Sequence, residues 1–361
     1  MKFGPTKRAL SALVLAGLLL GACGGDNKDT AAAPGGECPA TPDPATPLTL
    51  TFAAYSTPRE VYGKIIPAFQ TLWKEEHDDQ QVIFQESYGG STTQSQNVAS
   101  GFPADIVALS LGPDVDAVAD AGLITHDWED APDDGIVSTS LVVFDVREGN
   151  PQNIEDFDDL AGSVDVLTPD PASSGGARWN IVGAYGAALR GYAGGKKDDT
   201  AAAQELLKGI FTNVTVLDKT ARDSIKNFES GNGDVAITYE NEILTANDAG
   251  LPDEMVIPPS TVLIENPVAV VDENVDTHCV REVAEAFVEF LHTDEAKELY
   301  STVGFLRPTD AADAQKGDGE LFAPVEDLFT VEDLGGWDAI NEDVFGETDG
   351  IFTKAFEEAQ G

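Results

Sequence analysis

Residues 173–180, SSGGARWN, place serine and two glycines where a helix is expected to begin. The preceding VDVLTPDPA predicts a strand and a turn, and the following IVGAYGAALRG predicts an amphipathic or buried helix. Serine is a favoured N-cap, glycine lets a backbone approach a neighbour closely, and a helix N-terminus presents N–H groups without intrahelical partners. These residues therefore predict a binding site for an anion, with an ordinary helix cap as the alternative.

Two other turns have a similar arrangement. Ser91 follows a strand and the residues YGG, and Ala221 follows the strand VTVLD and the residues KT. In open α/β sheets, ligands bind at the carboxyl ends of strands, towards which the N-termini of the following helices point. If the fold brings these turns together, several helix N-termini converge on one small anion.

The pattern of elements from residue 48 onwards is that of an α/β protein. Short apolar strands such as 48–55 and 104–111 alternate with helical segments, which favours largely parallel sheets. A second series of strands and helices follows the strand at 139–147, and the C-terminal part is mostly helical. A chain of 361 residues is long enough for two domains of ordinary size.

The N-terminus has the features of an export signal. A basic segment is followed by the apolar run ALSALVLAGLLLGA, which ends in the lipobox-like Leu20-Gly21-Ala22-Cys23. We expect a lipoprotein signal peptide at 1–22, lipidation of Cys23, and a Pro/Gly-rich flexible tether at 23–47. The mature protein is then held by its lipid anchor at the outer face of the bacterial cytoplasmic membrane, or in the periplasm.

The charge of the chain excludes some partners. The formal net charge is −43, and removing residues 1–22 would make it more negative still. Such a field repels nucleic acids and anionic lipid surfaces, so neither is expected as a partner. An anion site in this chain must therefore work through local, oriented dipoles.

Metal and cofactor chemistry finds few ligands in this sequence. There are four scattered histidines and neither a CxxC nor an HExxH motif, so no metal and no cofactor is expected. Cys38 and Cys279 can pair in an oxidising compartment, and two free thiols are the alternative.

The motifs, taken in order, resemble the sulfate-binding proteins of sulfate/thiosulfate ABC importers. The resemblance covers essentially residues 48–361 and rests on AYSTPREVY (54–62), SYGGSTTQS (87–95), ADIVALSLGPDVDAVADAGLI (104–124), TPDPASSGGARWN (168–180), NVTVLDKTAR (213–222), GDVAITYENE (233–242), IENPVAVV (264–271), GFLRPTDA (304–311) and LFTVEDLGGWD (328–338). It implies a two-lobed periplasmic-binding-protein fold of type II, with the ligand cleft between the lobes and two hinge crossings near 138–146 and 256–266. Lobe 1 would comprise 48–140 and 262–361, and lobe 2 would comprise 141–261.

The resemblance also implies a set of ligand-binding residues. Backbone N–H groups would come from Ser56, Ser91, Gly175, Gly176 and Ala221, and side-chain donors from the hydroxyl of Ser174 and from Tyr239. Ser56 stands where well-known members have Asp, and because its backbone N–H is used there, binding is expected to survive. Tyr239 stands where they have Trp, and a phenol can donate or accept whereas an indole only donates. Arg178 and Arg222 are expected to hold the loops around the anion; the alternative is that they face solvent or pair with the chain's many acids.

The function implied is that of a monomeric receptor that captures sulfate and delivers it to an ABC transporter permease and its ATPase. Sulfate carries no proton at neutral pH, so a site built of donors satisfies it, whereas hydrogen phosphate needs an acceptor. Thiosulfate, phosphate, molybdate and tungstate are the alternative ligands. An esterase acting on sulfate or phosphate esters is the alternative from another class, but the matched positions contain no base, so no enzyme activity is expected.

Overall fold

A computed structural model describes residue 38, residues 44–251 and residues 254–361. The expected signal peptide, Cys23 and most of the expected tether lie outside the described residues. In the part that is described, no helix is both long enough and apolar enough to cross a membrane.

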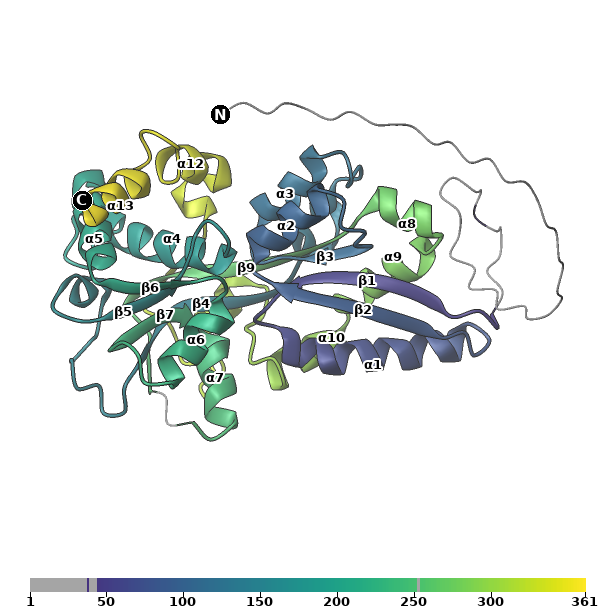
Figure 1. Cartoon of the computed structure of the whole chain (residues 1–361). Helices are drawn as coiled ribbons and strands as arrows, with labels where there is room; N and C mark the ends of the chain where they lie inside the picture. The colour runs from purple at the N-terminus through teal and green to yellow at the C-terminus, as the bar shows by residue number, and fades with distance from the viewer. Residues whose placement is uncertain (1–37, 39–43, 252–253) are drawn as a thin grey trace, which may run out of the picture. The chain divides into compact units, whose positions relative to one another are not determined.

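Strands and helices alternate over most of the described chain (Figure 1). The strands are β1 (Leu48–Tyr55), β2 (Val82–Gly89), β3 (Ile106–Ala108), β4 (Ile136–Val146), β5 (Val166–Pro169), β6 (Val214–Asp218), β7 (Val235–Tyr239), β8 (Glu254–Val256), β9 (Ser260–Val270) and β10 (Asp327–Phe329). The α-helices are α1 (Arg59–Glu76), α2 (Ser91–Ala99), α3 (Gly112–Asp120), α4 (Gly175–Leu189), α5 (Thr200–Thr212), α6 (Ala221–Glu229), α7 (Glu240–Asp248), α8 (Asp272–His278), α9 (Arg281–Leu291), α10 (Asp294–Thr302), α11 (Ala311–Lys316), α12 (Gly336–Asp343) and α13 (Ile351–Gln360).

Two long strands, β4 and β9, connect two groups of strands. The hydrogen-bonded order is β2-β1-β3-β9-β4-β7-β5-β6, in which β4 and β9 pair antiparallel from Ile136↔Pro267 to Leu141↔Leu263. Beyond this pairing, β9 continues along β3 and β4 continues along β7. The pairs β1–β2, β1–β3, β5–β6 and β5–β7 are parallel, as the alternation of strands and helices predicted.

Each group of strands has its own hydrophobic core. Around β1 and β3, Phe52 packs with α1, α9 and α10, whereas the next residue, Ala53, packs with α2 and α3 on the opposite face. Figure 1 shows α1 and the pair α2–α3 on opposite sides of these strands. Around β5 and β7, one face packs on α4 and α5, and the other packs Leu167 and Ala236 against α6. The predicted α/β fold with two lobes is confirmed; below, the first lobe is the group around β1–β3 and the second lobe the group around β5–β7.

The C-terminal segment differs from its expected place. Residues 262–361 were expected together in the first lobe, and α8, α9 and α10 do pack there. However, α13 packs against α5, and Phe352 and Ala355 join the core of the second lobe. The physical reason is the apolar face of α13, which covers the outer surface of α5.

The chain therefore passes between the lobes a third time, after α10. Arg307 N–H donates to the Thr139 carbonyl of β4 at 2.9 Å, and β10 then pairs with β9 from Asp327↔Ser260 to Phe329↔Val262. The buried Arg307 guanidinium pairs with Glu240, with 2.7 Å between Nη2 and Oε1. This passage adds to the two crossings expected from the sequence.

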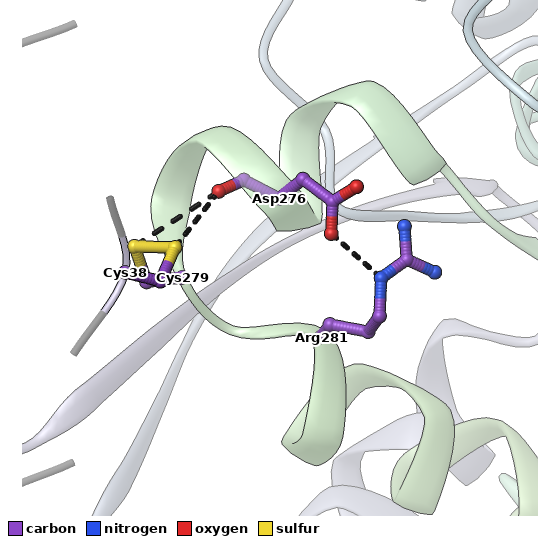
Figure 2. Close-up of a disulfide and its surroundings, with 4 residues drawn as sticks. All are labelled: Cys38, Asp276, Cys279 and Arg281. Atoms are coloured by element: carbon purple, nitrogen blue, oxygen red, sulfur yellow. Dashed lines mark hydrogen bonds and ion pairs between the residues drawn. A yellow bond between two sulfur atoms is a disulfide. The ribbon is translucent and has the colours of Figure 1, made fainter. Parts of the chain in front are cut away.

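A disulfide joins Cys38 to Cys279 (Figure 2). Cys279 ends α8, and the two cysteines are 241 residues apart in the sequence. Of the two alternatives for these cysteines, a disulfide or two free thiols, the structure shows the disulfide. The covalent link attaches residue 38 to the first lobe near Arg281, which pairs with Asp276 on α8 at 2.6 Å.

Candidate anion-binding site

A small cavity between the lobes brings together six of the seven predicted ligand-binding residues. The empty space among its lining residues is about 190 Å³, which includes space open to solvent. The predicted residues that line it are Ser56, Ser91, Ser174, Gly176, Ala221 and Tyr239, and they are joined by Tyr55, Thr57, Gly89, Gly90 and Ser110. Most of these side chains are buried, so a ligand held here is shielded from bulk water.

The positions of these residues follow from the ends of strands. Ser56 comes directly after β1, Ser91 is the first residue of α2, and Ala221 is the first residue of α6. Ser174 precedes α4, whose first two residues are Gly175 and Gly176. Because the first N–H groups of a helix have no intrahelical partners, the N-termini of α2, α4 and α6 direct donors and positive dipole ends towards one region.

Ser91 has a hydroxyl group that is already bonded to protein. It donates to Asp114 Oδ2 at 2.5 Å and accepts from the Ser110 N–H at 2.9 Å. Burial raises the pKa of Asp114 above its usual value, and this effect is larger than the lowering by the hydrogen bond from Ser91. The donor that Ser91 can offer to a ligand is therefore its backbone N–H, as the resemblance implied.

Ser174 does not cap its helix in the usual way. It is the N-cap residue of α4, but its side chain makes no capping hydrogen bond, and it is 3% exposed. By contrast, the Thr220 side chain at the start of α6 accepts from the Asp223 N–H. The hydroxyl of Ser174 thus remains available to the cavity, which favours the anion-site interpretation of SSGGARWN over the ordinary cap.

Gly175 is the predicted residue that does not line the cavity. A Cβ atom added there would overlap Leu111 and lie 2.7 Å from Ser110 Oγ, both in the first lobe. Glycine at this position lets the start of α4 approach the first lobe closely. Its N–H, at the first position of the helix, stays a predicted donor.

Tyr239 ends β7 and points its phenol into the cavity, where it meets Ser110. The two hydroxyl oxygens are 2.9 Å apart, and each residue is 1% exposed. Burial raises the pKa of Tyr239 well above its usual value, so the phenol keeps its proton. Sequence reasoning missed Ser110; its signal was a serine just past the buried strand in ADIVALSL, at the carboxyl end where ligands bind.

Arg178 lies outside the cavity and stabilises the surrounding structure. Its guanidinium lies 4.2 Å from the Phe345 ring centroid and donates to Asn341 Oδ1 at 3.0 Å. Burial lowers the pKa of Arg178 below its usual value, and the nearby carboxylate of Asp114 offsets this only in part. Arg178 therefore holds α4 against the C-terminal segment.

Arg222 connects the two lobes. It forms paired hydrogen bonds with Glu60 at 2.8 and 3.0 Å, contacts Glu242 at 2.7 Å and donates to the Thr57 carbonyl at 3.1 Å. Burial alone would lower the pKa of Arg222, but Glu242 and Glu60 outweigh it and the pKa is raised. Its positive charge is thus matched by two carboxylates, which is the alternative of pairing with acids; its role around the anion stays a prediction.

The cavity is electrically neutral at its walls. Among the described residues that line it, none is charged. An anion placed here would meet N–H and O–H dipoles and no charged side chain, the kind of site expected from the acidic composition. No group of His, Cys, Asp and Glu side chains in the described chain could hold a metal ion.

A larger groove elsewhere is unsuited to an anion. It is lined by the carboxylates of Asp116, Asp127, Glu129, Asp133, Asp134, Glu265, Asp310, Glu332 and Asp338. Burial, with the charges of Glu332 and Asp134, raises the pKa of Glu265 to about 7. The negative potential of this groove leaves the small neutral cavity as the candidate anion site.

The chain is similar to known solute-binding proteins. The family model described as bacterial extracellular solute-binding protein matches residues 50–306. A sulfate-binding protein of Synechococcus elongatus is 38% identical, with 96% of each chain covered, and one of Salmonella typhimurium is 41% identical over 83% of this chain and 91% of its own. A thiosulfate-binding protein of Pseudomonas aeruginosa is 34% identical over 85% of this chain and 92% of its own.

A solved structure is similar as well. The sulfate-binding protein SubI from Mycobacterium tuberculosis matches with a TM-score of 0.73 and 36% identity, over 82% of this chain and 99% of that one. A periplasmic thiamin-binding protein, at 13% identity and a TM-score of 0.61, shows the same fold.

Proposed function

The chain belongs to the bacterial extracellular solute-binding proteins, and from this premise we propose that it is the receptor of an ABC importer for sulfate. The observation that carries the proposal is the neutral, buried cavity between the lobes, into which the N-termini of α2, α4 and α6 direct their donors. The names of the relatives, sulfate-binding and thiosulfate-binding proteins, support the ligand class.

Sulfate would be held by donors from both lobes. We assign backbone N–H groups to Ser56, Ser91, Gly175, Gly176 and Ala221, the hydroxyl to Ser174 and the phenol to Tyr239. A dianion without a proton accepts all of these bonds. In a site that excludes water, each bond is stronger than it would be in solution.

Binding would close the two lobes about β4 and β9. The lobes are 48–140 with 262–306, and 141–261 with the C-terminal segment that ends in α13. Hinge closure around a ligand is the known motion of periplasmic binding proteins. Pairing of Arg222 with Glu60 across the cleft holds the closed state, which the permease and its ATPase then distinguish from the open one.

The protein works outside the cytoplasm as a monomer. The Cys38–Cys279 disulfide supports an oxidising compartment. We propose that Cys23 carries the lipid anchor, that no cofactor is needed and that the protein is not an enzyme. Mass spectrometry of the N-terminal peptide tests the anchor, because an unmodified Cys23 would contradict it.

The first experiment is a calorimetric titration of the exported protein with sulfate, thiosulfate, phosphate and molybdate at fixed pH and ionic strength. Tight sulfate binding supports the proposal, and tighter binding of another oxyanion would move the assignment to that anion. Ser174→Ala should weaken sulfate binding by about 1.5–3 kcal/mol, the contribution of a hydrogen bond to a charged group. The control is Ser230→Ala, because that hydroxyl bonds the Lys226 carbonyl on the surface. Hydrolysis of sulfate or phosphate esters by the protein would instead indicate an esterase.

A further inference from the structure

Ser110 and Tyr239 face each other across the cavity from different lobes. Ser110 follows β3, which belongs to the first lobe, and Tyr239 ends β7 in the second. Their 2.9 Å hydrogen bond is buried, and both residues line the cavity. The bond therefore forms beside the ligand position when the lobes are together.

The backbone of Ser110 is held in place by three hydrogen bonds. Its N–H donates to Ser91 Oγ at 2.9 Å, and its carbonyl accepts from Trp179 Nε1 at 2.6 Å and from Asn266 Nδ2 at 3.1 Å. These partners come from both lobes and from β9. The Ser110 hydroxyl is consequently presented to the phenol from a fixed position.

The two hydroxyl groups of this pair can each donate one hydrogen bond and accept another. The bond between them uses only one of the two hydrogens. When Ser110 donates to Tyr239, the phenol hydrogen is free to donate to the anion. When Tyr239 donates to Ser110, the phenol oxygen can accept a hydrogen from the ligand, and the serine hydrogen is available to the cavity.

We propose that Ser110 is a specificity-determining residue, whose hydroxyl lets Tyr239 either donate to an unprotonated tetrahedral oxyanion or accept from a monoprotonated one. This inference rests on the proposed function. It predicts that the receptor binds hydrogen phosphate measurably as well as sulfate. An indole in place of the phenol has no acceptor, so it could not make this exchange.

Removing the Ser110 hydroxyl should affect the two ligand types unequally. In Ser110→Ala, the phenol still donates to sulfate, so sulfate binding falls only slightly. Accepting from hydrogen phosphate would leave the phenol hydrogen without a partner, and a buried polar group without a partner is costly. We expect the ratio of the phosphate to the sulfate dissociation constant to rise about tenfold.

The experiment titrates the exported protein and its variants calorimetrically with sulfate and inorganic phosphate near pH 8, where phosphate is mostly monoprotonated. Selenate and arsenate repeat the comparison with a second, larger pair of anions, which separates protonation from size. Tyr239→Trp should raise the ratio as Ser110→Ala does. Ser95→Ala is the matched control, because Ser95 is a buried first-lobe serine whose hydroxyl donates to the Asp114 carbonyl at 2.6 Å, and it does not line the cavity.

The possible outcomes separate this inference from the proposed function. A ratio that rises in Ser110→Ala but not in Ser95→Ala supports the role of Ser110. Sulfate binding by the wild type with no response to millimolar phosphate, or an equal loss of both anions in Ser110→Ala, overturns it and leaves the sulfate receptor intact. A wild type that binds no sulfate contradicts the proposed function itself.

Discussion

Gly90 provides a direct test of whether lobe closure creates the binding site. It precedes α2 in the first lobe, and a Cβ atom added there would overlap the carbonyl oxygen of Ser173 and lie 2.9 Å from that of Lys219. Both oxygens belong to the backbone of the second lobe, so neither can turn aside as a side chain could. The Thr93 N–H also donates to the Ser173 carbonyl, at 3.2 Å, which shows how closely the lobes meet here. We therefore expect Gly90→Ala to prevent full closure.

The size of the effect follows from these distances. Ordinary contact begins near 3.4 Å, so the lobes must separate by at least about half an ångström at Lys219 and by more at Ser173. Donors of one lobe then lie too far from an anion held by the other, because hydrogen bonds weaken steeply beyond about 3.2 Å. Losing two charge-assisted bonds costs about 3–6 kcal/mol, which weakens sulfate binding on the order of a hundred- to ten-thousand-fold.

The assay is calorimetry with sulfate, combined with thermal unfolding in its presence and absence. Without sulfate, Gly90→Ala should unfold at the wild-type temperature, because the open protein accommodates the methyl group. With sulfate, its stabilisation should be largely lost, since ligand stabilisation depends on affinity. Gly63→Ala on α1 is the control, because apart from its chain neighbours and the helix's own backbone nothing lies within 4 Å of its added Cβ. Sulfate affinity within threefold of that control would refute the reasoning.

Three further outcomes are expected. Replacing both Cys38 and Cys279 with serine should lower the free energy of unfolding by about 3 kcal/mol in chemical denaturation. The reason is that the disulfide closes a long loop and so restricts the unfolded chain, whereas in the folded chain Cys38 is already held near β1, which begins ten residues later. Unchanged stability would contradict this. Glu265→Gln should raise the free energy of unfolding at pH 8 by up to about 3 kcal/mol and change it little at pH 4.5. Burial raises the pKa of Glu265 to about 7, so the folded protein loses stability as the pH rises from the unfolded pKa towards 7 and this carboxyl must ionise. An equal effect at both pH values would disprove the explanation. Glu60→Gln should weaken sulfate binding two- to fivefold, because the half-exposed Glu60 carboxylate forms an ion pair with Arg222 across the lobes that is worth about 0.5–1 kcal/mol. In the wild type, added NaCl should weaken sulfate binding by a similar factor. A sulfate affinity that changes with neither the substitution nor the salt would show that this ion pair does not contribute to closure.

Local sequence patterns were sufficient for most strands and helices and for three of the turns at the candidate site, whereas the full set of site residues came from the family resemblance. Ser91, Ser174 and Ala221 each stand where a strand gives way to a helix, and a helix start requires only the few residues around it. Helix N-termini point towards the carboxyl ends of parallel strands, which predicted an anion site provided that the fold brought these turns together. The meeting of the two lobes provides that condition, because all three residues line one cavity.

Other features depend on contacts between distant residues. Ser110 and Tyr239 are 129 residues apart, and although the place of Ser110 just past a buried strand was a signal, only the meeting of the lobes pairs it with Tyr239. Cys38 and Cys279 carried two alternatives, because the sequence does not state which surface a cysteine will reach. The C-terminal part was predicted to be mostly helical, but the sequence did not indicate that α13 would pack against α5 of the second lobe.

The sequence by itself thus determined the order of strands and helices, the positions of their N-termini and the acidic charge that demands a dipole-based anion site. The tertiary structure decided which donors share one cavity, which lobe receives the C-terminal helices and which cysteines are joined. The physical reason is that these interactions act over different distances along the chain. Backbone preference and hydrophobic periodicity act over a few residues, whereas packing and hydrogen-bond partners are chosen by the whole fold at once.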